Sequence, residues 1–346
     1  MQPAKNGYAA GMVKSCKLRA PRRLFSPLLV LSAVAACGGA CSQSAAQDPL
    51  GGAGTAVLVP SESGLSQGAP RLSLTMVDVG QGDGLVLQLP GGAVVAIDGG
   101  PTYGSQSGYN DFLTRNVKRV DFALLSHAHS DHYTGLSDAL ALMPQDCTAR
   151  AFDPGFDRPD IAGYQYFRTA AGCRYRATGK GMSLSFDPQV DISVLSAADT
   201  PYPLADSGGI NNTSLVTYIR FGHFAALLTG DAQTEAEKQV YADRMNLPAN
   251  VMKLGHHGSC NATATSYLRA VAPTVALISA AAGNDFGHPH CQTLAKLKAQ
   301  GTRFYRTDVN GTVTVQTDGE HFTVTASRGS ADDPSCPRSC GLPSDF

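Results

Sequence analysis

Tryptophan is absent from the 346-residue chain, and charged side chains make up only 16% of it. No apolar run reaches the roughly 20 residues that a membrane-spanning helix needs, which excludes a polytopic membrane protein. Acidic residues are missing from residues 1–36, where six of the 27 basic residues lie, so the rest of the chain has 21 basic and 28 acidic residues. Such an acidic body lacks the basic face that coats nucleic acid without sequence preference, although it permits a local phosphate site.

The first residues have the pattern of an export signal. Residues 24–36 form an apolar run behind basic residues, too short to span a bilayer but of the length of a signal-peptide core. The run ends in two alanines before Cys37, which resembles a bacterial lipoprotein box. Residues 1–36 are therefore the expected signal and Cys37 the expected lipidation site, with ordinary cleavage near an unmodified cysteine as the alternative. The arginine pair at 22–23 leaves general secretion and twin-arginine export both open.

The residues after this signal predict a flexible linker. Of the 33 residues that follow Cys37, 21 are glycine, proline, serine or alanine, so residues 37–70 are expected to be flexible. We therefore expect an exported protein in the bacterial periplasm or cell envelope, held at the membrane by the lipid on Cys37.

Nine cysteines agree with this compartment, because an oxidising environment permits disulfides. Cys147–Cys173 and Cys260–Cys291 are the expected pairs, and buried free thiols are the alternative. The cysteine spacing matches no zinc finger.

The body of the chain, residues 71–328, alternates strand-length apolar runs with glycine-rich turns. Strands are predicted first at 72–79, and a second β-rich block begins at residue 214, with helices between the strands of both blocks. This pattern predicts an α/β fold with two mixed β-sheets face to face and helices outside, an αββα four-layer sandwich. Residues 329–346, which contain two cysteines, are expected to form a loosely held tail.

A group of metal-ligating side chains follows the buried strand predicted at 122–126. His127, His129, Asp131 and His132 supply four ligand-type residues within six positions. In near-extended backbone, residues two apart point the same way. His127 and His129 can therefore hold one cation, while Asp131 and His132 serve a neighbouring cation. Imidazole and carboxylate together favour Zn²⁺, with Mn²⁺ or iron as alternatives. The spacing favours a metal site over a solvated histidine-rich loop.

Three later segments place similar side chains at strand ends. Asp231 ends an apolar strand and is placed to bridge two cations, although alone it fits a helix N-cap better. The pairs at 256–257 and 288–290 put histidines in glycine-flanked turns. Each pair alone is weak evidence, but four such segments at four strand ends favour one shared site.

These segments together resemble the metallo-β-lactamase fold superfamily, whose signature is a His-x-His-x-Asp-His loop. Within it they are most similar to the soluble hydrolase domain of ComEC-type DNA-uptake proteins. The resemblance covers residues 71–328 and rests on eight segments in order: 76–83, 97–100, 127–132, 211–214, 229–231, 255–259, 287–290 and 305–308. The membrane-channel portion of those proteins has no counterpart in this sequence, so the resemblance implies the hydrolase rather than transport.

The resemblance also implies a set of ligands for two divalent cations. They are His127, His129, Asp131, His132, Asp231, His256 and His288. The superfamily's usual middle histidine has no clear equivalent. Residues expected to orient the ligands are Asp83, Asp98, Asn212, Ser214 and His290. Cys260 and Cys291 each follow a site segment, so they are expected either to staple two loops or to serve as soft ligands.

The expected chemistry is hydrolysis. Two cations that share a solvent molecule lower its pKa toward about 7 and give hydroxide at neutral pH. Asp131 and Asp231 are the expected catalytic carboxylates. With His256 as a ligand, His257 is free to protonate the leaving group or contact a phosphate oxygen.

We therefore expect an exported binuclear metal-dependent hydrolase with a phosphodiester substrate, either DNA or an envelope component, and no protein partner. One alternative is a hydrolase of lactones, β-lactams or other acyl bonds. Another is a non-catalytic, competence-related binding protein. Metal content and hydrolysis of a generic phosphodiester distinguish the three.

Overall fold

The computed structural model describes residues 64–102, 108–148, 150–156, 158–196, 206–243 and 247–341. The expected signal peptide, Cys37 and most of the expected linker lie outside these ranges. None of the helices in them is long and apolar enough to cross a membrane.

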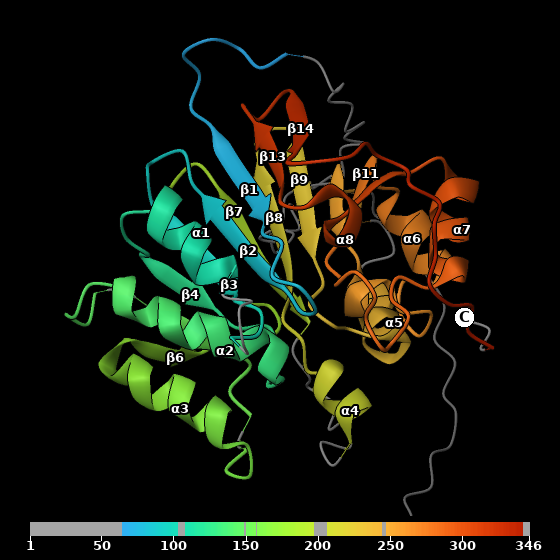
Figure 1. The fold of residues 1–346 in the computed structure, drawn as a ribbon. Helices are drawn as coiled ribbons and strands as arrows, with labels where there is room; N and C mark the ends of the chain where they lie inside the picture. Colours follow the sequence, from blue (N-terminus) through green and yellow to red (C-terminus); the bar gives the residue numbers. More distant parts are fainter. Residues whose placement is uncertain are drawn as a thin grey trace, which may run out of the picture. The chain divides into compact units, whose positions relative to one another are not determined.

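The described residues form two β-sheets (Figure 1). The first has eight strands in these ranges, in the order β14-β13-β1-β2-β3-β4-β5-β6. They are β1 (Leu72–Met76), β2 (Gly84–Gln88), β3 (Val94–Asp98), β4 (Phe122–Leu124), β5 (Arg150–Asp153), β6 (Tyr175–Ala177), β13 (Val313–Thr317) and β14 (Phe322–Ala326). The second has six in the described part, in the order β12-β11-β10-β9-β8-β7. They are β7 (Asp191–Ser196), β8 (Val216–Phe221), β9 (Phe224–Leu228), β10 (Val251–Lys253), β11 (Val275–Ile278) and β12 (Arg303–Arg306).

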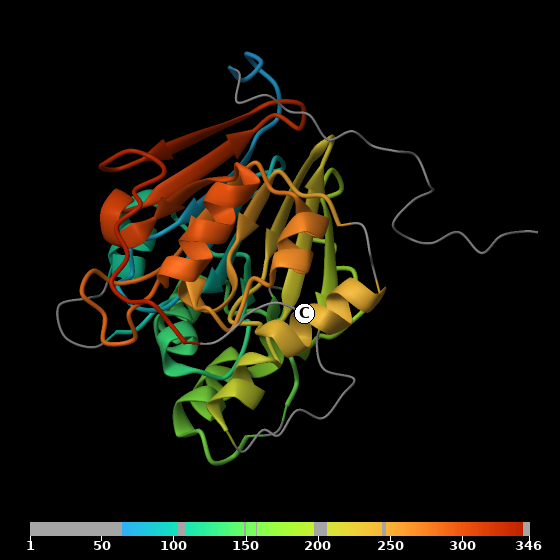
Figure 2. The same cartoon turned by 90° about the vertical axis from the view of Figure 1, so that its right-hand side faces the viewer.

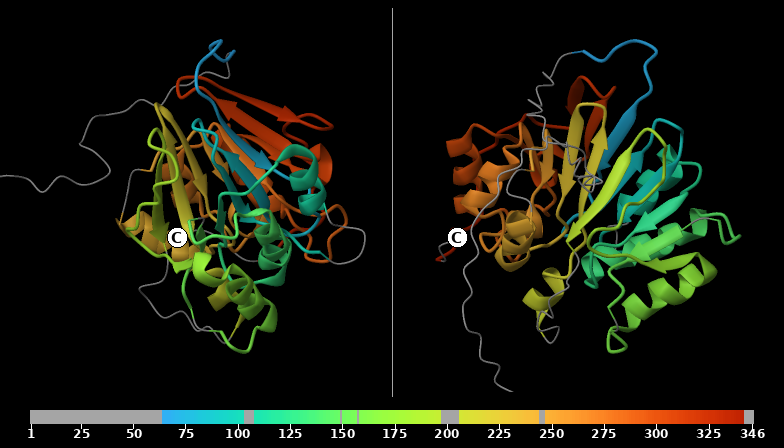
Figure 3. Two further views of the ribbon diagram at one scale, coloured as in Figure 1. Left: turned by 90° about the vertical axis from the view of Figure 1, so that its left-hand side faces the viewer. Right: turned by 180° about the vertical axis from the view of Figure 1, so that it is seen from behind.

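Helices cover the outer faces of both sheets. Green α1–α3 and orange α5–α7 lie on opposite sides of the paired sheets in Figure 1 and in the reverse view of Figure 3. Figure 2 shows the α6 and α7 side facing the viewer. The helices are α1 (Gly108–Asn116), α2 (Ser130–Ala139), α3 (Ala162–Ala171), α4 (Ser207–Asn211), α5 (Thr234–Asp243), α6 (Thr265–Val271), α7 (Cys291–Gln300) and α8 (Thr307–Asn310). Short 3₁₀ turns are η1 (Leu140–Leu142), η2 (Gly172–Arg174) and η3 (Gly255–Gly258).

The alternation of side chains along each strand produces two cores. In β3, Val95 and Ile97 join a cluster between the sheets, together with Ile219 and Leu277 of the second sheet. Val94 and Ala96 point the other way and pack with the helices that cover the first sheet. Since successive strand residues face opposite sides, fully apolar strands can serve both cores. The predicted αββα arrangement is confirmed.

The two β-rich blocks of the sequence do not map one to one onto the two sheets. The late strand β13 pairs antiparallel with β1, with Leu74 opposite Val315, so the chain returns to complete the first sheet. The strand predicted over residues 72–79 ends at Met76. From Val77 onward the backbone forms the turn that leads to Gly84 and the site, and Val77 N–H donates to Gly84 C=O.

Parallel pairing places the functional loops at one edge. β3, β4 and β5 run parallel in the first sheet, and β9, β10, β11 and β12 run parallel in the second. The carboxyl ends of parallel strands meet at the same edge, where α/β proteins form their binding sites. The histidine loop follows β4, Asp231 follows β9, and the two late histidine segments follow β10 and β11.

The disulfides agree only in part with the expected pairs. Cys147–Cys173 is confirmed. The expected Cys260–Cys291 bond is wrong, because Cys260 pairs with Cys340 and Cys291 with Cys336.

The Cys260–Cys291 prediction is wrong because of the path of the C-terminal tail. Residues 329–346 were expected to be loosely held, but their cysteines bond to the two loops. His290 and Arg338 form a parallel bridge, and Cys291 N–H donates to Arg338 C=O at 3.1 Å. The tail therefore runs beside the start of α7, with a tail cysteine within reach of each loop cysteine. A segment without strand or helix periodicity gives no sign of this path in the sequence.

Candidate metal centre

The histidine loop occupies the junction between β4 and α2. His129 is extended (φ −100°, ψ 148°) at the N-cap of α2, and His127 lies in the bend that precedes it. Asp131 and His132 lie in its first turn. His127 and His132 are buried, whereas His129 and Asp131 are half-buried. The change from strand to helix thus directs four ligand-type side chains into one small volume.

The carboxylate of Asp231 lies at the centre of this volume. Its Oδ2 is 3.2 Å from His257 Nε2, 3.3 Å from His132 Nε2 and 3.8 Å from His127 Nε2. His127 Nε2 is 2.9 Å from His129 Nδ1. Asp131 Oδ2 is 3.4 Å from His257 Nε2 and 3.8 Å from His132 Nε2.

The side chains that could hold a cation form two overlapping groups in the described residues, His127 with His132 and Asp231, and Asp131 with His132 and His257. His129 contacts the first group through His127. Asp231 Oδ2 lies within 3.8 Å of imidazoles of both groups.

Three buried atoms test whether these residues fit a cation. His132 Nε2, His257 Nε2 and Asp231 Oδ1 have no hydrogen-bond partner in the described part of the chain. Buried polar atoms are normally hydrogen-bonded, and an unpartnered one is costly. A divalent cation supplies the missing partner to all three, so the residues present fit a metal centre.

Hydrogen bonds behind the imidazoles point their free nitrogens into the centre. His132 Nδ1 is 2.8 Å from Asp98 Oδ2, and His257 Nδ1 is 3.0 Å from the carbonyl oxygen of Ser279. When each Nδ1–H donates to its acceptor, the lone pair remains on Nε2, the nitrogen that faces Asp231. Asp98 is itself held by the N–H and hydroxyl of Ser126, both at 2.7 Å. Asp98 therefore contacts His132 on the side of the ring away from Asp231, which is the position expected of a residue that orients this ring.

Asp83, also expected to orient a ligand, forms part of a buried charge network. It pairs with Lys253 Nζ, and its Oδ1 is 3.3 Å from His257 Nδ1. Lys253 is fully buried and donates to Gly230 C=O at 3.0 Å. Sequence reasoning missed Lys253. The signal was a lone lysine at the end of an apolar strand, immediately before the glycine-histidine turn.

Asn212 and Ser214 support the loop that carries Asp231. The N–H of Asp231 donates to Ser214 Oγ at 3.0 Å, and the N–H of Gln233 donates to Asn212 Oδ1 at 3.0 Å. The adjacent Gly230 has φ +51°, and a Cβ there would lie 2.8 Å from Ser126 Cβ. Only glycine allows this close approach of the Asp231 loop to the histidine loop.

The structure separates the two histidines of the late pair. Both have left-handed backbone, φ 45° for His256 and 55° for His257. His257 is buried against Asp231. The His256 ring instead faces amides, with Nδ1 3.0 Å from Asn261 Oδ1 and Nε2 3.4 Å from Asn211 Nδ2.

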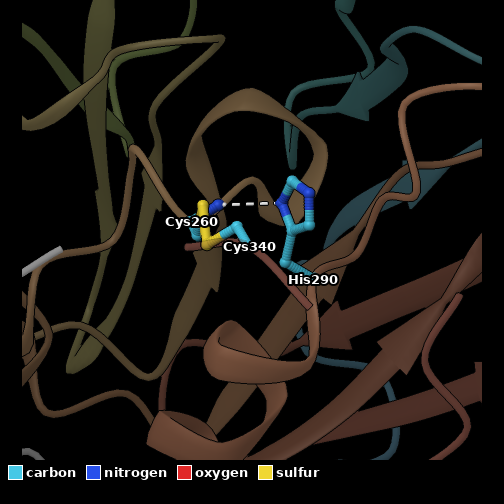
Figure 4. A group of neighbouring side chains, drawn as sticks. All are labelled: Cys260, His290 and Cys340. Atoms are coloured by element: carbon cyan, nitrogen blue, oxygen red, sulfur yellow. Dashed lines mark hydrogen bonds between the residues drawn. A yellow bond between two sulfur atoms is a disulfide. The ribbon is translucent and has the colours of Figure 1, made fainter. Parts of the chain in front are cut away.

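The two histidines of the last segment also lie apart. His288 faces the centre, with its ring 5.2 Å from that of His256 and a buried Nδ1 that lacks a hydrogen-bond partner within the described ranges. His290 turns toward the disulfide of Cys260 and Cys340, where its Nδ1 accepts the Cys260 N–H at 3.1 Å (Figure 4). His290 is therefore a support for the loops, not a group in the centre.

The charges of the centre determine its protonation. Burial lowers the pKa of His132, but the carboxylates of Asp231, Asp131 and Asp98 outweigh burial and raise it well above the usual value. Burial raises the pKa of Asp231, but His257 and His132 hold it well below the usual range. Burial of His257 is likewise outweighed by aspartates, which raise its pKa, whereas burial lowers the pKa of His127 and His129. Protons on His132 and His257 therefore balance the carboxylates without cations, and a cation that displaced them would release protons.

A cavity of about 210 Å³ opens onto this centre. Its walls include Gln81, Asp131, Asp231, His256, Phe286 and His288. His129 and His257 also line it, so the histidine loop, the Asp231 loop and the late histidine pair all border the cavity.

Comparison with known proteins finds relatives among the competence proteins. No protein-family profile matches the chain. The chain is 30% identical over 257 residues to ComE operon protein 3 of Bacillus subtilis, covering 69% of this chain and 32% of that protein. It is 29% identical over 241 residues to competence protein ComA of Neisseria gonorrhoeae, covering 69% and 31%. The chain thus spans about a third of the length of these relatives.

A solved structure with a similar arrangement is the metallo-β-lactamase fold protein YhfI of Bacillus subtilis. It is 13% identical, with 68% of this chain and 95% of that chain covered and a TM-score of 0.45.

Proposed function

Because the chain is a homologue of the ComEC-type competence proteins and has the metallo-β-lactamase fold, we propose that it is a binuclear metal-dependent phosphodiesterase. The observation that carries the proposal is the position of Asp231, whose Oδ2 lies within 3.8 Å of three imidazole nitrogens. Two cations held by one carboxylate suit an anionic phosphodiester, because both can bind its oxygens. The relation to competence proteins favours nucleic acid as the source of that phosphodiester.

We assign the ligands in two groups. His127, His129 and Asp231 would hold one cation, and Asp131, His132, His257 and Asp231 the other, with Zn²⁺ expected and Mn²⁺ as the alternative. His288 remains the candidate that completes the first group, since its buried Nδ1 lacks a partner among the described residues.

This assignment exchanges the expected roles of His256 and His257. The burial of His257, its Nδ1 contact with Ser279 and its free Nε2 support a ligand role. His256 lines the cavity and has its ring nitrogens near amides, which supports contact with the substrate.

The chain's own residues position the expected ligands and orient their rings. When bound, the two cations supply Lewis acidity and lower the pKa of water. Asp98 and Ser279 fix the rings of His132 and His257, and Lys253 balances the charge of Asp83 behind them. Burial lowers the pKa of His256, so its imidazole is neutral, with Nδ1–H facing Asn261 Oδ1 and Nε2 near Asn211 Nδ2; the ring lines the cavity where a bound substrate would contact it.

The test combines metal analysis with an activity panel on the full chain. We expect two metal equivalents and hydrolysis of bis(p-nitrophenyl) phosphate. Asp231→Asn should lose metal and lower kcat by at least about 10³-fold, because it removes a charge between two dications. The matched control is His223→Ala, because His223 is an exposed histidine on the β8–β9 hairpin. This variant should keep its metal content and its kcat.

Other outcomes would overturn the proposal. A protein that cleaves lactones or β-lactams but no phosphodiester has the acyl-bond activity instead. Metal binding without any hydrolysis would leave a binding protein.

A further inference from the structure

Phe286 is an exposed aromatic ring at the edge of the metal cavity. Its side chain is 60% exposed, and it lines the same cavity as Asp131, Asp231 and His256. The other large exposed apolar side chains in the described residues, Tyr166 and Met182, do not line it. An exposed phenylalanine carries a hydration cost that a flat apolar partner would remove.

The loop around Phe286 holds the ring in place. The ring stacks on His288 with 5.6 Å between the centroids and 19° between the planes. The side chain of Asn284 donates to the carbonyl oxygens of Ala281 at 2.9 Å and His288 at 2.6 Å, and accepts the His288 N–H at 2.9 Å. Phe286 is therefore ordered before any ligand binds, so a partner that stacks on it spends little entropy on ordering the loop.

The cavity has no basic groove for a nucleic-acid backbone. None of the residues that line it in the described part of the chain is lysine or arginine. A substrate held by its charge alone would therefore depend on the two cations. Phe286 lies at the exposed edge of this cavity of about 210 Å³, so the group next to a phosphodiester bound at Asp231 can contact the ring.

From these observations we propose that Phe286 is a stacking platform for an unpaired nucleobase next to the scissile phosphodiester. The proposal rests on the proposed phosphodiesterase function and narrows its substrate to single-stranded nucleic acid or a nucleotide end. A base within a duplex is already stacked on its neighbours and would have to be unstacked to reach the ring. Base–aromatic stacking tolerates any sequence, because every base has a flat face.

The experiment uses the full-length protein and two kinds of matched substrate, intact and abasic. The intact substrate is the dinucleotide dTpdT, and the two abasic ones each replace one of its thymidines by an abasic deoxyribose analogue. We expect wild-type protein to prefer dTpdT by roughly 10- to 100-fold in kcat/KM, the range of one base–aromatic stack. Phe286→Ala should lose this preference by slowing dTpdT alone. Tyr166→Ala, an equally exposed aromatic residue away from the cavity, should leave both rates unchanged.

Two conservative variants separate stacking from damage to His288. Phe286→Tyr keeps the ring and should keep the preference. Phe286→Leu keeps apolar bulk without a ring and should lose the preference while metal content stays at the wild-type level. If Phe286→Ala loses metal, the comparison of Phe286→Tyr with Phe286→Leu decides whether the aromatic ring itself gives the preference.

The failure of this proposal is distinguishable from failure of the proposed function. Equal wild-type rates on the intact and abasic substrates, or an equal loss on both in Phe286→Leu, would overturn stacking and leave the phosphodiesterase. No hydrolysis of either substrate or of bis(p-nitrophenyl) phosphate would overturn the function itself.

Discussion

At the scale of single residues, the direction of each imidazole determines what it can do. His132 and His257 each have Nδ1 near an acceptor behind the centre and Nε2 directed at Asp231. His256 directs its ring toward the amides of Asn261 and Asn211. Two neighbours in sequence therefore have different environments, and their substitutions should fail in different ways.

The first prediction separates these two histidines. His257→Ala should lose about one metal equivalent, because it removes an Nε2 ligand. His256→Ala should keep both metals and lower kcat by about 10- to 100-fold, because the ring that lines the cavity and contacts Asn261 and Asn211 is lost. Metal content by mass spectrometry and steady-state kinetics check the result. The opposite outcome, with metal lost only in His256→Ala, would restore the roles expected from sequence.

At the scale of elements, a buried carboxylate joins two helices of the second sheet's outer layer. Glu237 of α5 accepts the N–H groups of Thr263 at 2.5 Å and Ala264 at 2.9 Å, just before α6 begins. Burial raises the pKa of Glu237 to about 7. This side chain thus stabilises the start of α6 and makes its stability depend on pH.

The second prediction follows from that raised pKa. Between about pH 4.5 and 7 the folded chain retains a proton that the unfolded chain releases, so this contribution to stability falls as pH rises. The slope is at most about 1.4 kcal/mol per pH unit. Glu237→Gln should remove this contribution and so change the slope of the wild-type protein by up to about 1.4 kcal/mol per pH unit, measured by urea unfolding across this range. The exposed Glu320→Gln is the control, and an unchanged slope in Glu237→Gln would contradict the assignment.

Two disulfides connect the C-terminal tail to the loops of the late histidines. Cys291 follows His290 directly, and Cys260 lies three residues after His257, so each bond restrains one histidine segment. In the third prediction, replacing Cys291 and Cys336 by serine should destabilise the fold by about 2–4 kcal/mol and weaken metal binding.

The control for that prediction is the remaining disulfide. Replacing Cys147 and Cys173 by serine should cost similar stability, since that bond also closes a loop, of 26 residues. Its metal affinity should stay unchanged, because neither cysteine lies beside a ligand loop. Chemical unfolding and retention of Zn²⁺ against a chelator measure the two effects. Equal metal affinity in both variants would show that the tail plays no part in the site.

At the scale of the whole molecule, the expected export and the expected lipid anchor are two parts of one prediction. The three disulfides in the described residues agree with the expected oxidising compartment. Lipidation of Cys37 stays a prediction, since this residue lies outside the described ranges.

The fourth prediction tests that anchor. Wild-type protein should enter the detergent phase of a phase separation, and Cys37→Ser should move it to the aqueous phase with metal content unchanged. Wild-type protein that partitions entirely into the aqueous phase would exclude the lipid.

The sequence by itself determined the features that are local in the chain. The spacing of His127 to His132 reveals a ligand loop, because a strand followed by a helix places such residues together whatever surrounds them. The strand predicted at 122–126 from its apolar run contains β4, Phe122–Leu124. Helix α1 was not predicted, because its nine residues are mostly polar and only Tyr109 and Leu113 are buried.

Only the tertiary structure decided which distant groups meet. Lys253 finds Asp83 across 170 positions, and the tail cysteines reach Cys260 and Cys291. Which of His256 and His257 faces Asp231 depends on their two consecutive left-handed backbone conformations, which turn the rings in different directions. Such choices are made by packing against other strands, whose free energy depends on contacts that the local sequence does not contain.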